Sequence, residues 1–503
     1  MTTTAASGDS YYVFQGRRVP LPRSRSFAAV RWPRDQQVHI AFAAGGGSPN
    51  RRDGIHYLPH ARTMLLPQEM LGPFVLGPGG PREWPVFERD DGSLLIPDDF
   101  AVVSREGLDE AAAGDLARSF RAEVVSTPSQ IYPHYLFRAG DGDAIRLANL
   151  LAERQGLAAQ PGFTYLLSRR FACVRSAALR VPPPHNWALE RTKVREAWKI
   201  HRGSPSVVTA ILDVGVDVEH DELKANLAPG YDAHDNDEDA APGQDPTSEQ
   251  AHGTACAGIV AALGNNDLGI VGIAPASRVA PYRIGNMRPA WIELRPGSIA
   301  RSIHHAANAG VPILANSYSL TGDTFDDIEA AIRYAVTERG CLFVAAAGND
   351  DKEVHFPANS PHAMAVAATN LLDERCGPAD WTNGGSCKGS GISVAAPGSH
   401  VWTTDLRGEL GYNSGKSAGG VHGDYTLTFA GTSAACPFVA GVAALVRSVA
   451  PRLGAPEMRG ILEATADKVG AERDPYVGGR NQSLGHGRVN ALAAVELAFR
   501  ERA

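Results

Sequence analysis

Reactive side chains stand at the ends of three expected regular elements, and their positions limit the folds open to this chain. The apolar run 207–212 predicts a buried β-strand, which ends at Asp213. His252 precedes an Ala- and Gly-rich segment, 253–263, that predicts a helix. Ser433 precedes a second such helix, 434–449, with Pro437 expected in its first turn. A carboxylate after a buried strand and two helix starts predict an α/β domain, a mostly parallel sheet with helices on both faces.

These residue types suit nucleophilic catalysis in the order Asp213, His252, Ser433. A serine hydroxyl is a weak nucleophile until a base takes its proton, and imidazole titrates near neutral pH. A buried carboxylate fixes the tautomer of that imidazole and stabilises its protonated form. A fourth string, the apolar strand 341–347 followed by Gly348 and Asn349, places an amide that can donate to a developing oxyanion. Four strings in this order are unlike a chance set of turns and capping residues.

The chain resembles the subtilisin-like serine endopeptidases over roughly its last three hundred residues. The Asp, His, Ser order is that of subtilisin. The matching stretches are 213–217 with His220, 252–258, 272–275, 395–398, 431–437 and 485–490. The resemblance implies that Asp213, His252 and Ser433 are the triad and Asn349 the oxyanion donor. Cys256, Cys436 and the acidic stretch 231–237 resemble the kexin-like and calcium-dependent bacterial branches.

Three positions depart from the family pattern. Val214 replaces the Ser or Thr that usually follows the triad aspartate, and Ala434 replaces the usual Met after the nucleophile. In the strand that flanks the specificity pocket, residues 317–319 are Ser-Tyr-Ser, whereas the family commonly has Ser-Leu-Gly there. The resemblance assigns substrate binding to Ser317, Tyr318, Ser319, Ala346, Ala347, Gly348 and His355, with His355 at the pocket floor. An imidazole floor and Ser319 on the wall predict a preference for small or medium uncharged residues over Lys and Arg.

The resemblance also implies a structural calcium ion. Segment 263–270 is similar to the family's calcium loop. The expected ligands are the side chains of Glu222 and Asn266 and the carbonyl groups of Leu263, Leu268 and Ile270, a set of hard oxygens that suits Ca²⁺. The alternative is an Asn- and Gly-rich turn without metal. The acidic stretch 232–245 is either a second ion site or a solvated loop.

The chain upstream of the peptidase predicts two further regions. Segment 98–172 has the pattern βαββαβ, with helices expected at 110–120 and 143–155, which is an α+β, ferredoxin-like order. It resembles the propeptides that chaperone and inhibit subtilisin-like enzymes; the alternative is a permanent accessory domain. Residues 1–97 are Gly- and Pro-rich with short β runs, a β-rich region of unknown role. A Pro-rich linker, 173–189, precedes the expected peptidase domain, 190–503.

Composition narrows the partners. At 503 residues and 44% hydrophobic content the chain can bury several cores. A net charge of −7 gives no basic surface for nucleic acid, and we expect no membrane span. The N-terminus lacks the features of a secretory signal, so we expect a cytoplasmic enzyme or one exported without such a signal.

Cys256 and Cys436 are expected as buried free thiols, whereas Cys376 and Cys387 are the one candidate disulfide pair.

We therefore interpret the sequence as a serine endopeptidase that forms an acyl-enzyme on Ser433 and matures by cutting itself. Its partners would be protein or peptide substrates and its own propeptide-like domain. The alternative is a catalytically silent subtilisin-like binding or regulatory protein, held shut by its N-terminal domain. The intact set of catalytic residue types argues against that alternative.

Overall fold

The computed structural model describes most of the chain, in two compact units, Met1–Leu167 and Ser168–Ala503. Each unit is described by itself. The described residues are 11–14, 17–25, 27–31, 56–58, 63–67, 82–89, 93–104, 108–128, 134–168, 176–177, 184, 186–243, 248–266, 269–287, 291–295, 297–320, 326–382, 384–413 and 423–501.

The first unit begins with short antiparallel strands. β1 pairs with β2, and a second sheet has the order β4-β5-β3-β6. The strands of these two sheets are β1 (Tyr11–Phe14), β2 (Arg17–Pro20), β3 (Phe27–Arg31), β4 (His56–Leu58), β5 (Thr63–Pro67) and β6 (Arg82–Trp84). The next strand, β7 (Phe87–Glu88), pairs with the first strand of the following sheet. The described part of residues 1–97 is thus β-rich, as predicted.

The rest of the first unit has the predicted βαββαβ order. Its strands pair antiparallel in the order β11-β8-β10-β9. The elements are β8 (Leu94–Ser104), α1 (Glu110–Ser119), β9 (Ala122–Ser126), β10 (His134–Ala139), α2 (Ala144–Gln155) and β11 (Ala159–Ser168). Asp109 and Asp143 cap the two helices through backbone N–H groups. Helix α1 buries alanines, and helix α2 buries alanines and leucines, in one core with Tyr135 and Phe137 of the sheet.

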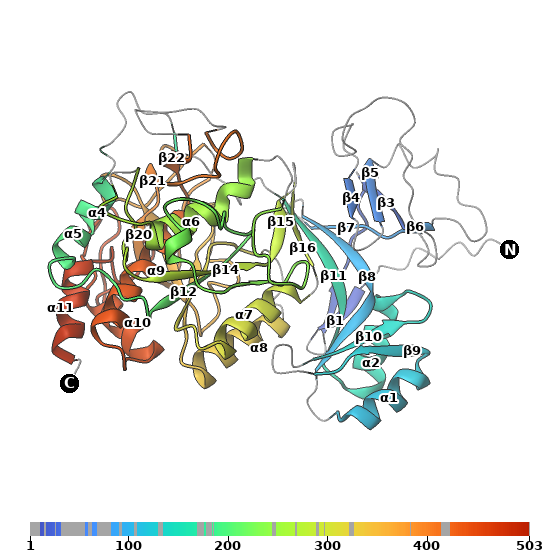
Figure 1. Ribbon diagram of the computed structural model, residues 1–503. Helices are drawn as coiled ribbons and strands as arrows, with labels where there is room; N and C mark the ends of the chain where they lie inside the picture. The colour runs from blue at the N-terminus through green and yellow to red at the C-terminus, as the bar shows by residue number, and fades with distance from the viewer. Residues whose placement is uncertain are drawn as a thin grey trace. The chain divides into compact units, whose positions relative to one another are not determined.

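The second unit is built on a seven-stranded parallel sheet, which places the carboxyl ends of its strands at one edge (Figure 1). The strand order is β13-β14-β12-β17-β18-β19-β20. The strands are β12 (Val208–Asp213), β13 (Tyr231–Asp232), β14 (Arg278–Arg283), β17 (Ile313–Asn316), β18 (Leu342–Ala346), β19 (Met364–Thr369) and β20 (Ile392–Pro397).

Both faces of this sheet are covered. Alternate residues, such as Ile211 and Val344, join the main apolar core with α6 (His252–Ala261) and α9 (Thr432–Val449). Their neighbours Leu212 and Phe343 point to the opposite face and are also buried. On a parallel sheet this requires helices on both sides, which confirms the predicted fold class.

The remaining elements surround this sheet. α7 contacts β12 and packs against α8, and α11 packs against α9. Two antiparallel pairs, β15 with β16 and β21 with β22, lie outside the parallel sheet. The bounds are α4 (Trp187–Arg191), α5 (Val194–Ala197), η2 (Lys224–Asn226), η3 (Ser248–Ala251), β15 (Gly285–Met287), β16 (Trp291–Leu294), α7 (Ser298–Asn308), α8 (Asp326–Arg333), the π-helix η4 (Tyr334–Glu338), β21 (Val401–Thr404), β22 (Tyr425–Phe429), α10 (Ala455–Ala464) and α11 (Ala491–Glu501).

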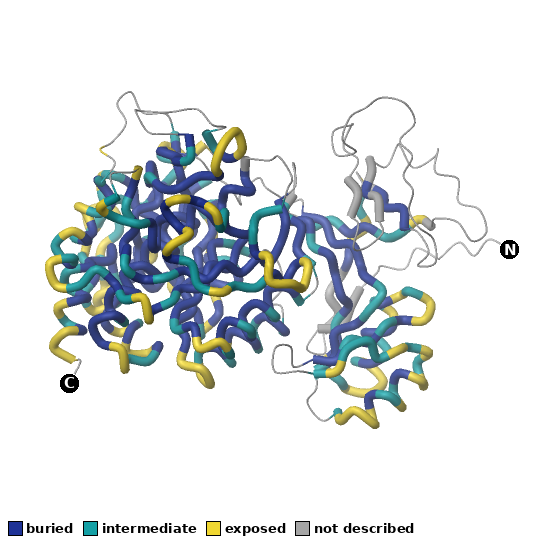
Figure 2. Tube along the Cα trace, viewed as in Figure 1, coloured by how far each residue is buried: buried dark blue, intermediate teal, exposed yellow. Residues whose placement is uncertain are grey.

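Helix α9 forms the centre of the main core, where Figure 2 shows a continuous buried zone. Among the helices that the structure describes, it is the one long and apolar enough to cross a membrane, but 94% of that window is buried inside the protein. Such burial is typical of a core helix.

Candidate active site

The sheet edge brings Asp213 and His252 into direct contact. Asp213 is the last residue of β12, and His252 is the first residue of α6. Nδ1 of His252 lies 2.9 Å from both carboxylate oxygens of Asp213, and Oδ1 of Asp213 also accepts from the N–H of Val214 at 2.9 Å. Gly253 permits this approach, since a Cβ there would lie 2.2 Å from the carbonyl oxygen of Gly215. Both ionisable side chains are buried.

The contact with Asp213 changes the titration of His252. Burial alone would lower the pKa of His252, but attraction and hydrogen bonding by the Asp213 carboxylate outweigh it and raise this pKa above 6.5. The imidazole ring also makes a T-shaped contact with the ring of Phe429, with centroids 5.5 Å apart. The ring is therefore fixed in orientation by one polar and one apolar neighbour.

Ser433 lies one residue inside α9, which begins at Thr432 rather than after Ser433. The sequence suggested that Pro437 lies in the first turn of the helix, but with this start it lies beyond the first turn. Its missing N–H therefore leaves the carbonyl group of Ser433 without a partner in the helix. Two side chains donate to that carbonyl instead, Ser317 Oγ at 3.1 Å and Cys256 Sγ at 3.5 Å. The hydroxyl of Ser433 donates to the carbonyl oxygen of Ser317 at 3.1 Å. Two neighbouring segments, helix α6 and the segment that follows β17, thus hold the serine in place.

Asn349 lies at the same sheet edge, three residues after β18. Its Oδ1 accepts two hydrogen bonds from Thr432, one from the backbone N–H at 2.9 Å and one from the hydroxyl at 2.8 Å. The Thr432 hydroxyl in turn accepts from the N–H of Gly348 at 3.2 Å. Because Oδ1 is occupied in this way, the amide presents its NH₂ group on the opposite side. Asn349 and the N-terminus of α9 are therefore joined as one donor assembly.

The other residues assigned to substrate binding fall into two groups. Ser317, Ala346, Ala347 and Gly348 are buried around Asn349 and Ser433, whereas Tyr318 and Ser319 are half-buried. His355 turns its Nε2 toward Oδ1 of Asp350, 2.7 Å away.

The cysteines follow one sequence prediction and not another. Cys256 and Cys436 are buried free thiols, as predicted. Cys376 and Cys387 are also free and buried, so the candidate disulfide between them is not present. Their backbones instead join neighbouring segments, since Cys376 N–H donates to Ala368 and Cys387 N–H to Gly348. Cys173 lies outside the described residues.

The expected calcium ligands converge around Glu222. This carboxylate accepts from Asn266 Nδ2 at 2.9 Å and from the Tyr425 hydroxyl at 3.0 Å, and the N–H of Leu263 donates to its backbone carbonyl. Burial raises the pKa of Glu222. The N–H of Glu222 donates to Nδ1 of His220 at 3.1 Å.

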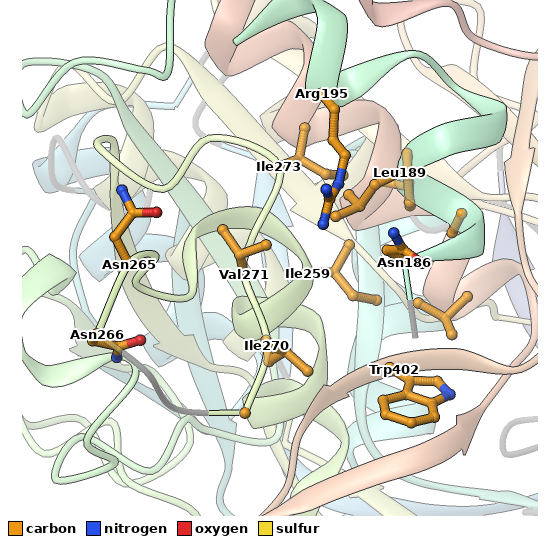
Figure 3. Close-up of a pocket in the computed structure, with 14 residues that line it drawn as sticks. Asn186, Leu189, Arg195, Ile259, Asn265, Asn266, Ile270, Val271, Ile273 and Trp402 are labelled. Carbon is orange, nitrogen blue, oxygen red and sulfur yellow. The ribbon is translucent and has the colours of Figure 1, made fainter. Parts of the chain in front are cut away.

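Those neighbours leave the buried carboxylate of Glu222 bonded to uncharged donors, and among the described residues no Lys or Arg pairs with it. Such a site suits a hard cation, so the donor set fits calcium. Asn266 and Ile270 also line a cavity of about 210 Å³, beside Asn186, Arg195 and Trp402 (Figure 3). Leu268 lies outside the described residues.

The described part of the acidic stretch 232–245 contains internally paired carboxylates. Arg283 bonds to both Asp232 and Asp235, and Arg295 pairs with Asp235 at 2.9 Å. Asp232 is buried and Asp235 is exposed to solvent, and neither could bind an ion without losing an arginine partner.

Comparison with known proteins assigns the second unit. Residues 204–487, which include Asp213, His252, Asn349 and Ser433, match the model of the subtilase family of peptidases. The chain belongs to the subtilase family. It is 33% identical over 311 residues to thermitase of Thermoactinomyces vulgaris, an alignment that covers 61% of this chain and 94% of thermitase.

Two further relatives are longer than the part that matches this chain. This subtilase is 33% identical to a calcium-dependent protease of Trichormus variabilis over 65% of its own chain and 53% of that protease, so it spans about half of that relative's length. The structure also superposes on the crystal structure of fervidolysin from Fervidobacterium pennivorans, with a TM-score of 0.62 and 23% sequence identity, and this match covers 62% of the fervidolysin chain. That fold match takes in 81% of this subtilase, more than the second unit alone provides.

Sequence reasoning missed the residues that position the reactive groups in this subtilase. Thr432 orients Asn349, and Phe429 packs on His252. Thr432 could have been found from the sequence, because it is a hydroxyl residue directly before Ser433 at an expected helix start. Phe429 could not, because β22 is distant in sequence from β12 and α6.

Proposed function

We propose that this subtilase is a serine endopeptidase that cleaves protein substrates through an acyl-enzyme on Ser433. The observation that carries this proposal is the contact of His252 with the buried Asp213 carboxylate, at the start of a helix, α6, that packs against the helix carrying Ser433. The 2.9 Å contacts of Nδ1 with Asp213 leave Nε2 as the basic atom of the neutral ring. Ser433, His252 and Asp213 then take the roles of nucleophile, base and orienting acid.

The proton of Ser433 must pass to His252 during attack. In the resting arrangement the hydroxyl donates to the carbonyl of Ser317, so it must turn toward Nε2 of His252 when substrate binds. The buried Asp213 carboxylate stabilises the imidazolium that results. His252 then returns the proton to the leaving amine, and water hydrolyses the ester by the same route in reverse.

Asn349 and the N–H of Ser433 supply the oxyanion donors. The Ser433 N–H is among the first of α9, which have no partner within the helix, and it carries the positive end of the helix dipole. The Asn349 amide is already oriented by Thr432, so it need not reorganise as charge develops.

The test is covalent labelling with a fluorophosphonate, which reacts only with an activated serine. Wild-type protein should be labelled on Ser433 and should hydrolyse casein, and Ser433→Ala should do neither. Ser448→Ala is the matched control, because Ser448 lies on the same helix and its hydroxyl bonds only to the helix carbonyl of Ala444. A folded wild type that is not labelled would favour the silent binding protein.

We propose further that residues 98–172 act as a propeptide and intramolecular inhibitor. The βαββαβ order of this segment supports the idea. Wild-type enzyme should cut itself between Arg169 and Asn186, and Ser433→Ala should accumulate at full length. Intact-mass measurement separates the two, and an active enzyme that stays one chain would instead support a permanent accessory domain.

We also propose that Glu222, Asn266 and the carbonyl groups of Leu263, Leu268 and Ile270 hold a structural calcium ion. The calcium-dependent protease of Trichormus variabilis supports this by name, and the uncompensated Glu222 carboxylate supports it by chemistry. Chelation with EGTA should lower the unfolding midpoint of Ser433→Ala protein, and Glu222→Gln should remove that response. An equal response in the variant would contradict these ligands.

For specificity we propose small or medium uncharged residues before the cut. Asp350 is the acid closest in sequence to the pocket, and its carboxylate is already bonded to His355 at 2.7 Å and to Lys352 at 3.2 Å. It is thus poorly placed to attract a substrate cation. A peptide-library profile dominated by Lys or Arg would refute this preference.

A further inference from the structure

Three potential metal ligands of different kinds meet beside the oxyanion donor. Oδ1 of Asp350 lies 2.7 Å from Nε2 of His355 and 3.0 Å from Sγ of Cys387. The three ligand atoms all lie within 4.8 Å of one another. None of them belongs to the calcium set or to the triad, and the proposed peptidase mechanism does not use the Cys387 thiol.

The backbone holds this cluster together by close packing. Gly348 has a φ of +112°, and a Cβ there would lie 2.5 Å from the His355 ring and 2.9 Å from Sγ of Cys387. The N–H of Cys387 donates to the carbonyl of Gly348, and the N–H of His355 donates to the carbonyl of Ala347. Cys387 is fully buried, whereas the His355 side chain is 17% exposed, which gives the cluster one open side.

We propose that Asp350, His355 and Cys387 form a binding site for a zinc ion. A carboxylate, an imidazole and a thiolate are the ligand types that zinc takes in proteins, and softness of the sulfur favours zinc over calcium or magnesium. Three protein ligands leave a fourth position for water on the side that His355 exposes. Lys352 pairs with the other oxygen of Asp350, Oδ2, at 3.2 Å, so Oδ1 remains the metal-facing atom.

Metal binding must displace the thiol proton. Burial and the neighbouring Asp350 carboxylate raise the pKa of Cys387 to about 12, so without metal the thiol stays protonated and donates to Asp350. Binding converts Cys387–SH and Zn²⁺ into a Cys387–S⁻–Zn²⁺ bond and one released proton. In the metal-free site His355 donates from Nε2 to Oδ1 of Asp350, so that ring hydrogen must move to Nδ1 when the Nε2 lone pair coordinates the ion. Zinc affinity should therefore increase with pH.

The bound ion would cross-link the two segments that support Asn349. Segment 348–355 carries two of the ligands, and segment 385–388 carries the third. The segments are already joined by the N–H of Gly385 donating to the carbonyl of Asn349 at 3.0 Å and by the N–H of Asp351 donating to the carbonyl of Gly385 at 2.8 Å. Because zinc would bind this folded arrangement in preference to the unfolded chain, it should raise thermal stability.

The experiment titrates full-length Ser433→Ala protein with Co²⁺ and then Zn²⁺ in excess calcium. This background is free of self-cleavage, and it makes the result independent of whether the enzyme is active. We expect a thiolate-to-cobalt charge-transfer band at one equivalent, its loss when zinc displaces cobalt, and a rise of several degrees in the unfolding midpoint with zinc. Cys387→Ser should abolish the band, and His355→Gln should weaken zinc binding at least tenfold.

Two cysteine variants serve as matched controls. Cys376→Ser removes a buried free thiol from the same region and should leave the band intact. Cys256→Ser should also leave it intact, although Cys256 lies beside Asp213 and His252. A band that persists in Cys387→Ser but disappears in Cys256→Ser would overturn the proposal. So would the absence of a band in Ser433→Ala protein whose calorimetric unfolding shows that it is folded.

Discussion

Replacement of Thr432 by Val isolates the positioning of the oxyanion donor from its presence. Val has nearly the same volume, but it lacks the hydroxyl that accepts from Gly348 N–H at 3.2 Å and donates to Asn349 Oδ1 at 2.8 Å. The backbone N–H of Thr432 would keep its own 2.9 Å bond to that Oδ1. The change therefore loosens the amide of Asn349 without removing it.

The magnitude follows from these contacts. A buried N–H left without a partner costs about 1–3 kcal/mol, so Thr432→Val should lower the free energy of unfolding by about 2 kcal/mol. Loss of one of the two anchors should lower kcat about tenfold, or about 1.4 kcal/mol in the barrier. Asn349→Ala should cost more, about a hundred- to thousandfold, the effect established for such a donor in subtilisin, a member of the same family.

Steady-state kinetics on a peptide anilide with stability-matched controls would test this reasoning. The loss should fall in kcat with KM little changed, because the amide acts on the transition state. Thr432→Ser restores the hydroxyl and should recover most of the activity. A Thr432→Val enzyme with wild-type kcat and lowered stability would show that Thr432 supports the fold only.

Three further predictions concern charge. Because the pKa of His252 is raised and the base must be neutral, the acidic limb of kcat/KM should have its midpoint above pH 6.5, checked by a pH–rate profile. Burial would raise the pKa of Asp350, but the hydrogen bonds from His355 and Cys387 outweigh it and hold this pKa well below its usual range. A depressed pKa in the folded state adds stability that is lost as pH falls below the unfolded value near 4. Asp350→Asn should therefore flatten the decline in the free energy of unfolding between about pH 5 and 3, measured by urea titration. Arg488→Leu should lower the free energy of unfolding by about 3 kcal/mol, measured by thermal denaturation, because Arg488 is buried between Asp373 and Asp467. An Arg488→Leu protein as stable as wild type would contradict the role of these two ion pairs.

The sequence predicted the parallel sheet and the convergence of the reactive residues because both depend on local patterns. Apolar runs of strand length end at Asp213 and shortly before Asn349, and parallel strands bring their carboxyl ends to one edge. The helices that begin at His252 and near Ser433 follow from Ala- and Gly-rich composition. Identification of these residue types needed no knowledge of long-range packing.

The partners of those residues could not be predicted in the same way. Phe429 reaches His252 from β22, and Cys387 reaches Asp350 from a loop 37 residues later in the chain. Both contacts depend on how loops return to the sheet edge, which local patterns do not encode. Cys376 and Cys387 were only a candidate disulfide pair, and the structure leaves both thiols free, because their spacing said nothing about the direction of each side chain.

Pro437 illustrates how a small error in a helix boundary conceals a functional arrangement. With the helix starting after Ser433, Pro437 falls in the first turn, where its missing N–H has no consequence. With the helix starting at Thr432, the same proline deprives the Ser433 carbonyl of its helical donor, and Ser317 and Cys256 bond to it instead. Ser317 directly follows strand β17, and Cys256 lies in helix α6. The proline therefore ties the nucleophile to both neighbouring segments, because it leaves an acceptor that only they can satisfy.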